Sequence, residues 1–375
     1  MQSTLAHYIG PLYGKFAVMG RKEVCMIYMH PDFDGHEQIL FCHDESVGLR
    51  AIIAVHSTAL GPAAGGCRMH PYASEQEALT DVLRLSRGMT YKNAGAGLPL
   101  GGGKCVIIAD PDDPKKPTLL RAFAHHVQAL QGRYWTAIDI GVGPEDADIL
   151  AENCDYIFAR ALQYEPGFNP SNFTALGGFI GIKAACEATF GTADLTGIRV
   201  AVQGLGATGY ALCRHLHEAG AMLHVTDIRE EIVAQLVAEF GATAVSPDRI
   251  HAAEVDVFAP CALGAGLNDD TIPEITAKVI CGLANNQLAE DRHGAILAAA
   301  GIAYVPDYIV NAGGMMGAST VIFAEPSRAA SIRQIEGLHD RIATILTTAE
   351  AEGRPTADIA DQMARDRIRR AAAQS

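Results

Sequence analysis

The stretch GIRVAVQGLGATGYALCRHLHEAGAMLHVTDI, residues 197–228, has the pattern of a strand, a glycine-rich turn, a helix and a second strand. The turn GLGATG at 204–209 has the spacing G-x-G-x-x-G, and the second strand ends on Asp227. In a nucleotide-binding unit of this kind, the glycines permit the tight turn, the approach of a pyrophosphate and close helix packing, while the carboxylate takes the ribose hydroxyls. The pattern predicts a Rossmann-type dinucleotide site made by Gly204, Gly206, Ala207, Thr208, Gly209 and Asp227.

The acidic side chain at Asp227 bears on the choice of cofactor. A carboxylate at this position repels the 2′-phosphate of NADP, so we expect NAD. Arg229 follows two residues later and could instead accept that phosphate, or simply face solvent. The sequence leaves the role of Arg229 open.

Strands alternate with helices along most of the chain, which is typical of an α/β protein. Residues 38–44 and 49–60 have the pattern of strands, 61–72 of a glycine-rich loop, and 74–94 of a helix in which Ser74 and Glu77 form a capping box. Beyond residue 318, an apolar stripe at helical spacing runs to a stop at Gly353. We predict a first α/β domain at 1–170, a Rossmann domain at 171–318 and C-terminal helices at 319–375 that return to the first domain.

Composition excludes several classes of function. The 375 residues carry a net charge of −14, which argues against a nucleic acid or an anionic membrane as partner. Nine cysteines occur with no C-x-x-C pair, so neither a disulfide framework nor a metal site is indicated. The N-terminus lacks the pattern of a secretion signal, and no run of apolar residues is long enough to span a membrane. We expect a cytoplasmic protein.

A second glycine-rich stretch, GLPLGGGKCVI at 97–107, places Lys104 behind three glycines and ahead of an apolar run. It is not a nucleotide phosphate loop, because Leu98 and Cys105 stand where that loop needs a glycine and a hydroxyl. One interpretation is that the glycines let a substrate approach the main chain and hold Lys104 at the mouth of a cleft. The other is a flexible turn with a solvated lysine.

Several segments taken together resemble a known family. They are GPAAGGCRM, LSRGMTYKNAGAGLPLGGGKCVI, the aspartate of TAIDIG, VQGLGATG, DVFAPCALG, GLANNQL and PDYIVNAGG. In this order they resemble the dehydrogenases of leucine, valine and phenylalanine, which are relatives of glutamate dehydrogenase, and the pattern is nearest to leucine dehydrogenase. The resemblance implies reversible NAD-dependent conversion of an apolar L-amino acid to a 2-oxo acid and ammonia, in a homo-oligomer built through the first domain. A glutamate-type dehydrogenase and a non-catalytic NAD sensor are the alternatives.

The resemblance also implies roles for individual residues. Lys92 would bind the substrate carboxylate, Lys104 would be the general base that activates water, and Asp139 would carry protons to and from the amino group. A lysine base needs desolvation and a neighbouring cation, which Lys92 could supply. The other interpretation of Asp139 is a capping residue before GVGPED. Further substrate contacts would be Gly65, Gly66, Met69 and Asn311, and further cofactor contacts Thr174, Ala262, Leu263 and Asn286.

The expected pocket for the substrate side chain is apolar. The resemblance places Ala64, Ala137, Phe158, Met315 and Ala318 around it. Ala64 stands where glutamate-using relatives carry a lysine, so glutamate should be a poor substrate. The pocket departs from the leucine pattern at Ala64, at Phe158 and at MMGAS (315–319). Branched aliphatic amino acids are expected to be the preferred substrates, and aromatic amino acids are left open as substrates.

Overall fold

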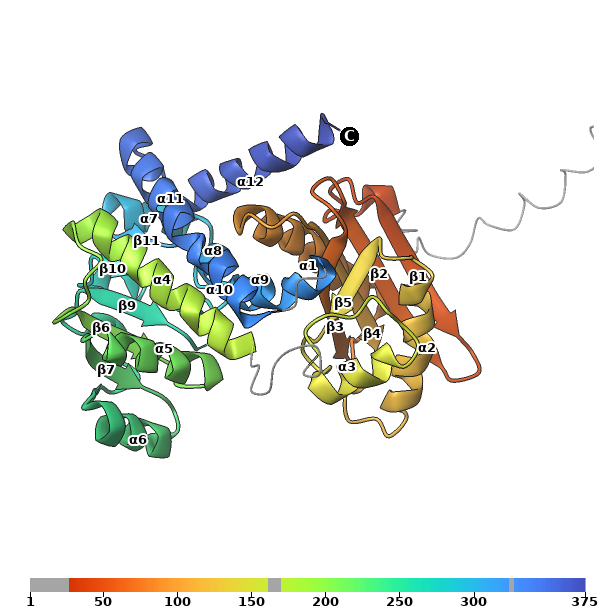
Figure 1. Cartoon of the computed structure of the whole chain (residues 1–375), viewed down its shortest axis with the longest axis horizontal. Coiled ribbons are helices and arrows are strands. Elements are labelled where there is room, and N and C mark those ends of the chain that lie inside the picture. The colour runs from red at the N-terminus through yellow and green to blue at the C-terminus, as the bar shows by residue number, and fades with distance from the viewer. Residues whose placement is uncertain (1–26, 161–169, 263, 324–326, 375) are drawn as a thin grey trace, which may run out of the picture. The chain divides into compact units, whose positions relative to one another are not determined.

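The computed structural model describes residues 27–160, 170–262, 264–323 and 327–374. The chain divides into two compact units, residues 1–35 and 36–375. In the smaller unit, the described residues include a short 3-10 helix, η1 (Ile27–Met29). The larger unit holds two separate β-sheets with their helices (Figure 1). The domain boundaries predicted at residues 170 and 318 stay predictions.

The first sheet has five strands in the order β1-β2-β4-β3-β5. They are β1 (Gln38–Asp44), β2 (Leu49–Ser57), β3 (Ala63–His70), β4 (Gly101–Ile108) and β5 (Tyr134–Ala137). The pairs β1/β2 and β2/β4 are antiparallel, and β3 is parallel to both β4 and β5. The helices of this region are α1 (Glu75–Gly95), α2 (Lys116–Gln128) and α3 (Pro144–Ala151). Half of the capping box expected at the start of α1 is confirmed, because the Ser74 side chain accepts a hydrogen bond from the backbone N–H of Glu77. The other half differs, because the Glu77 carboxylate accepts from the N–H of Ala73 at 2.9 Å.

The two faces of this sheet have different neighbours. Side chains alternate between faces along a strand. Cys67 and Met69 on β3, with Cys105 and Ile107 on β4, belong to a core cluster that also contains residues of α2 and α3. The alternate positions, which include Lys104, therefore lie on the opposite face, and α1 packs on β4 and β2.

The expectation of a loop at 61–72 is wrong, because β3 occupies residues 63–70 in the interior of the sheet. Its glycines are explained by packing. A Cβ atom at Gly65 would lie 2.0 Å from the carbonyl oxygen of Gly103, and one at Gly66 would lie 2.5 Å from that of Ile138. Glycine disfavours strands in isolation, but here it is the residue that lets the backbones approach.

The glycines before Lys104 also belong to a strand rather than a turn. β4 begins at Gly101, and a Cβ atom at Gly102 would lie 2.1 Å from the backbone nitrogen of Thr90 on α1. A Cβ atom at Gly103 would lie 2.6 Å from the Tyr134 ring. Both interpretations of these glycines, as room for a substrate and as a flexible turn, are therefore replaced by close packing of β4 against its neighbours.

The second sheet is parallel throughout, in the order β11-β10-β9-β6-β7-β8. The strands are β6 (Arg199–Gln203), β7 (Met222–Thr226), β8 (Thr243–Ala244), β9 (Val257–Pro260), β10 (Val279–Ile280) and β11 (Ala303–Tyr304). The associated helices are α4 (Pro170–Phe190), α5 (Ala207–Glu218), α6 (Glu230–Phe240) and α7 (Arg292–Ala299). Strand order reverses between β6 and β9, which confirms the expected Rossmann-type fold, and in such sheets ligands bind at the carboxyl ends of the strands beside this reversal.

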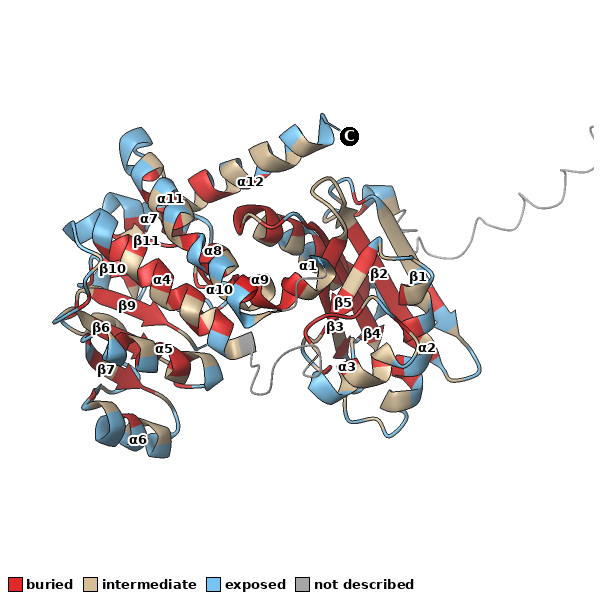
Figure 2. Cartoon of the chain, in the orientation of Figure 1, coloured by how far each residue is buried: buried red, intermediate tan, exposed pale blue. Residues whose placement is uncertain are grey.

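The C-terminal region is helical, as expected. It contains α8 (Asp307–Val310), α9 (Gly313–Ser319), α10 (Arg328–Glu336), α11 (Leu338–Glu352) and α12 (Thr356–Ala372). The predicted apolar stripe is divided between α10 and α11 and is buried apart from the half-buried Ile332, and Gly353 ends α11 in a left-handed conformation. α12 packs on α1, where Arg367 donates a hydrogen bond to the carbonyl of Ala94 at 3.0 Å. Buried residues concentrate in the inner strands of both sheets (Figure 2).

Across the described residues, none of the helices has the length and apolar character that crossing a membrane requires.

Candidate active site

The turn after β6 has the geometry that a dinucleotide needs. Gly204 adopts φ +95°, in the region that favours glycine, and a Cβ atom there would lie 2.7 Å from the Cβ of Ala262. A Cβ atom at Gly209 would lie 2.0 Å from the carbonyl oxygen of Gly204, so α5 packs directly on the turn. Gly206, in contrast, faces open space. An open backbone at the start of α5 is where a pyrophosphate can approach.

Asp227 and Arg229 form an ion pair at the end of β7. The Asp227 carboxylate accepts a hydrogen bond from the N–H of Leu205 at 2.6 Å and lies 3.0 Å from Nε of Arg229. These contacts, led by the hydrogen bond from the guanidinium, lower the pKa of Asp227 to about 2. The carboxylate is therefore ionised and tied to the glycine turn, where it can accept from ribose hydroxyls.

Lys104 and Asp139 meet beside the carboxyl end of β5. Lys104 is buried on β4, and its Nζ lies 3.0 Å from Oδ2 of Asp139. Nε of Arg68 on β3 donates to the same oxygen at 3.0 Å. Burial raises the pKa of Asp139, but the Lys104 ammonium and the Arg68 guanidinium outweigh it and leave this pKa below its ordinary value. Asp139 is thus an ionised carboxylate that can accept a proton.

The capping interpretation of Asp139 is wrong. α3 begins at Pro144, its N-cap is Gly143, and the side chain of Asp146 accepts from the Gly143 N–H at 2.7 Å. Asp139 contributes only backbone hydrogen bonds with Val142 to this turn. Its side chain is left for Lys104 and Arg68.

Lys92 lies on α1 and contacts residues from the second half of the chain. Its Nζ donates to Oδ1 of Asn311 at 2.7 Å, and Nδ2 of Asn311 donates to Oδ1 of Asn285 at 2.9 Å. Burial lowers the pKa of Lys92 to about 8, against the opposing effect of the Asp307 carboxylate and with a contribution from Lys104. The two lysines therefore interact, and an anionic ligand is the group that would best satisfy Lys92.

The residues expected around the substrate side chain come from distant segments of the chain and join one apolar core cluster. Ala64, Ala137, Phe158 and Ala318 are buried in one core cluster, and Met315 packs against it. Gly66 lies beside Asp139, since a Cβ atom there would be 2.9 Å from the Cβ of that residue. Met69 is not brought to these residues, because it is buried on the opposite face of the sheet.

The other residues expected to contact the cofactor lie in several different parts of the structure. Thr174 lies in the first turns of α4, and Ala262 packs on Gly204 at the crevice. Asn286 is exposed in a left-handed conformation with φ +52°. Leu263 lies outside the described residues. Sequence reasoning missed Arg68 and Asn285, for which no local pattern gives a signal, since their partners come from remote segments.

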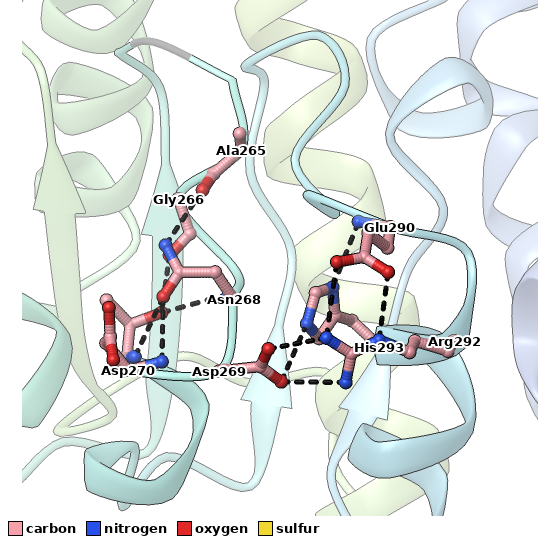
Figure 3. Close-up of polar contacts among 9 residues, drawn as sticks. Ala265, Gly266, Asn268, Asp269, Asp270, Glu290, Arg292 and His293 are labelled. Carbon is pink, nitrogen blue, oxygen red and sulfur yellow. Dashed lines mark hydrogen bonds and ion pairs between the residues drawn. The ribbon is translucent and has the colours of Figure 1, made fainter.

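An acidic cluster elsewhere in the second half of the chain brings together Asp269, Glu290 and His293 (Figure 3). Arg292 lies between the two carboxylates, with Nη1 2.8 Å from Asp269 and Nε 2.9 Å from Glu290. The imidazole of His293 contacts the Glu290 N–H through Nδ1 and Asp269 through Nε2. Because a guanidinium already neutralises these carboxylates, the cluster is an ion-pair network that joins α7 to the segment before it.

Comparison with known proteins agrees with this geometry. Residues 36–156 match the profile of the Glu/Leu/Phe/Val dehydrogenase dimerisation domain, and residues 221–373 match that of Glutamate/Leucine/Phenylalanine/Valine dehydrogenase. Leucine dehydrogenase of Geobacillus stearothermophilus is 51% identical over 333 residues, which cover 89% of this chain and 90% of that protein. The chain belongs to the glutamate/leucine/phenylalanine/valine dehydrogenase family. It is therefore an amino-acid dehydrogenase by family, with the Rossmann-type domain of NAD(P)-dependent enzymes.

Other members of the family are similar to different degrees. Phenylalanine dehydrogenase of Caldalkalibacillus thermarum is 44% identical, covering 90% of this chain and 92% of that protein. The crystal structure of L-tryptophan dehydrogenase from Nostoc punctiforme has a TM-score of 0.82 at 43% identity and covers 91% of this chain and 98% of that chain. A hetero-hexameric glutamate dehydrogenase from Thermus thermophilus, at 22% identity and a TM-score of 0.72 over 90% of each chain, shares the fold.

Proposed function

We propose that this protein oxidises an apolar L-amino acid with NAD, giving the 2-oxo acid, ammonia and NADH in a reversible reaction. The observation that carries the proposal is the meeting of Lys104 with Asp139 at 3.0 Å, beside a second lysine, Lys92, whose pKa is lowered to about 8 by burial. Such a set offers a proton acceptor, a general base and a carboxylate anchor. The named activities of the similar leucine, phenylalanine and tryptophan dehydrogenases support the same reaction class.

The chain's own residues would divide the chemistry as follows. Lys92 binds the substrate carboxylate, and the ionised Asp139 takes a proton from the ammonium group. The dinucleotide, when bound, supplies the hydride acceptor. Lys104, once its own ammonium proton has passed to solvent, takes a proton from the water that attacks the imine carbon. Asp139 returns its proton to the nitrogen, and as the C–N bond breaks the hydroxyl proton passes to solvent, so that ammonia leaves and the carbon becomes the 2-oxo group. The order requires Asp139 to be ionised first, in agreement with its lowered pKa.

NAD is the cofactor that the turn favours. The open backbone at Gly206 and the ionised Asp227 suit a pyrophosphate and an unmodified ribose. Arg229 is paired with Asp227, so its charge is partly neutralised at the place where a 2′-phosphate would sit. These contacts support NAD over NADP.

The substrate pocket supports an apolar side chain. Ala64 and Phe158 lie in the same apolar cluster, and a distal carboxylate placed there would lose hydration without a partner. We propose branched aliphatic amino acids as the leading substrates. The phenylalanine and tryptophan dehydrogenases among the relatives favour aromatic amino acids as the second candidate.

A panel of L-amino acids, followed by the appearance of NADH absorbance, tests the function and the ranking together. The double variant Phe158→Thr with Ala64→Leu should shift selectivity towards leucine over phenylalanine by roughly 1 to 3 kcal/mol. A kcat/KM for glutamate above that for every apolar amino acid would overturn the pocket assignment. Absence of turnover with all of them, despite NAD binding, would favour a sensor.

We also propose a cytoplasmic homo-oligomer assembled through the first domain. The profile matched by residues 36–156 is described as a dimerisation domain. The cysteines that the structure describes are all free, which suits a reducing compartment. Light scattering of the purified protein measures the mass, and a monomer would contradict the assembly.

A further inference from the structure

We propose that Arg68 is a positioning residue that holds the Asp139 carboxylate in place for proton transfer, and that Asp81 and Tyr72 hold Arg68 in turn. The inference rests on the proposed function, because it assigns a task within the same reaction. Arg68 is not expected to touch the substrate.

The geometry is that of a guanidinium clamped between two carboxylates. Nε of Arg68 donates to Oδ2 of Asp139 at 3.0 Å, while its Nη1 donates to Oδ2 of Asp81 at 2.9 Å. The hydroxyl of Tyr72 donates to the same Asp81 oxygen at 2.6 Å. The four groups come from β3, from the turn after it, from α1 and from the segment after β5. A planar guanidinium with contacts on two edges has its orientation determined by both.

The chemistry explains why a second cation is needed at Asp139. Oδ2 of Asp139 receives both Lys104 and Arg68 at 3.0 Å. Lys104 changes its charge if it acts as a base, so its attraction for Asp139 varies during the reaction. A guanidinium stays protonated throughout. Arg68 therefore keeps a positive charge and a hydrogen bond at the Asp139 carboxylate throughout the reaction.

The electrostatic surroundings of Asp139 support a measurable effect on pH dependence. Besides Arg68, the titratable groups of the described residues that interact electrostatically with Asp139 are Lys104 on β4, Lys92 on α1 and, from the other face of the sheet, Cys67 on β3. Arg68 lowers the pKa of Asp139, both by its charge and by its hydrogen bond. Loss of Arg68 should thus raise the pKa of the group that must be ionised, and move the acid limb of the rate profile to higher pH.

A surface cavity gives solvent access to Arg68. It has a volume of about 500 Å³ and is lined by Arg68, Tyr72 and Asp81 together with His70, Thr80 and Arg84. Removal of the Arg68 side chain would extend this cavity towards Asp139. A free guanidinium ion could then enter from solvent and occupy the vacated place.

The experiment compares Arg68→Ala, Arg68→Gln and Arg68→Lys with Arg121→Ala. Arg121 forms a similar arginine–carboxylate pair with Glu152 on the surface and serves as the matched control. Arg68→Ala should lower kcat by up to about 100-fold through misplacement of the carboxylate, with little change in KM. The acid limb of the pH–rate profile of Arg68→Ala should move to higher pH by about one unit. Millimolar guanidinium should restore part of kcat in Arg68→Ala, but not in Lys104→Ala.

The conservative variants separate charge from position. Arg68→Lys should keep most of the acid limb of the pH–rate profile but lower kcat, because a single ammonium nitrogen lacks the planar fork whose separate nitrogens reach the two carboxylates. Arg68→Gln removes the charge but keeps an uncharged polar side chain with the same Cβ–Cγ–Cδ stem, and it decides the question if the alanine variant does not fold. Wild-type kcat and an unshifted acid limb in the folded glutamine variant would overturn the proposal, as would an equal loss in Arg121→Ala. An inactive wild-type enzyme would instead overturn the proposed function.

Discussion

Raising the pH through 8 should weaken the binding of a carboxylate ligand, because Lys92 loses its proton in that range. Burial lowers the pKa of Lys92 to about 8 from an ordinary value of 10.5. The ammonium form therefore predominates below pH 8 and the neutral amine above it. Only the ammonium form can make a charge-assisted contact with a substrate carboxylate.

The size of the effect follows from the same shift. A fall from 10.5 to about 8 corresponds to roughly 3.5 kcal/mol at about 1.4 kcal/mol per pH unit. This is the penalty that a bound carboxylate can relieve. Above the pKa, the affinity should fall about tenfold per pH unit until the contact, worth about 1.5 to 3 kcal/mol, is lost.

Isocaproate is a suitable probe, because it has the carbon skeleton of leucine without the amino group. Its carboxyl titrates near about pH 4, so it stays ionised while Lys92 changes. The inhibition constant against L-leucine is measured from about pH 6 to about pH 10 in the wild type, in Lys92→Arg and in Lys92→Met. We expect the inhibition constant to rise above pH 8 in the wild type and to stay constant with pH in the arginine variant. In the methionine variant it should be high at every pH.

The arginine variant isolates Lys92 from its charged neighbours. Asp307, Lys104 and Asp139 all interact with it and remain in that variant. A rise in Lys92→Arg equal to that of the wild type would show that another group titrates. A constant inhibition constant in the wild type, or unchanged binding in Lys92→Met, would refute the assignment of Lys92 to the carboxylate.

Three further predictions concern the base, the cofactor and the fold. Lys104→Ala should lower kcat by about 10²- to 10⁴-fold while NADH binding, followed by fluorescence, is retained; near-normal kcat would exclude Lys104 as the base. Asp227→Ser should weaken the binding of NAD by about 1.5 to 3 kcal/mol and bring kcat/KM for NAD closer to kcat/KM for NADP. An unchanged ratio of these two kcat/KM values would contradict the role of Asp227 in the choice of cofactor. Gly102→Ala should lower the free energy of unfolding by about 1 to 3 kcal/mol, because its Cβ would meet the backbone of α1. Gly88→Ala is the control, because Gly88 lies on α1 with open space where its Cβ atom would be, and it should not lower the free energy of unfolding. Equal losses in the two variants on urea denaturation would disprove the packing argument.

Features that depend on near neighbours were predictable from the sequence. The turn at Gly204, the cap at Ser74 and the end of α11 at Gly353 all occur where the pattern predicts them. Each is determined within a few residues, by a backbone conformation that favours glycine or by a side chain that reaches the next turn. Strand and helix alternation likewise sufficed for the fold class, since it reflects which faces must be buried.

Glycine-rich segments were the main failure of the prediction. β3 and the start of β4 have the local composition of loops, yet both lie inside the first sheet. Their glycines are needed because carbonyl groups, an aromatic ring and the backbone of α1 approach within the distance of a Cβ atom. That approach exists only after distant strands and a helix have packed, so no local propensity reports it.

The candidate site shows the same division. Lys92, Lys104 and Asp139 can be named from a family resemblance, but their partners cannot. Lys92 contacts Asn311, which is 219 residues away in the chain, and Asp139 contacts Arg68, which is 71 residues away. Which charges meet, and how far burial lowers the pKa of Lys92, depend on the packing of α1 against the first sheet and the C-terminal half of the chain. A local pattern specifies backbone conformation over a few residues, whereas pairing and desolvation of charges arise only from contacts between remote segments.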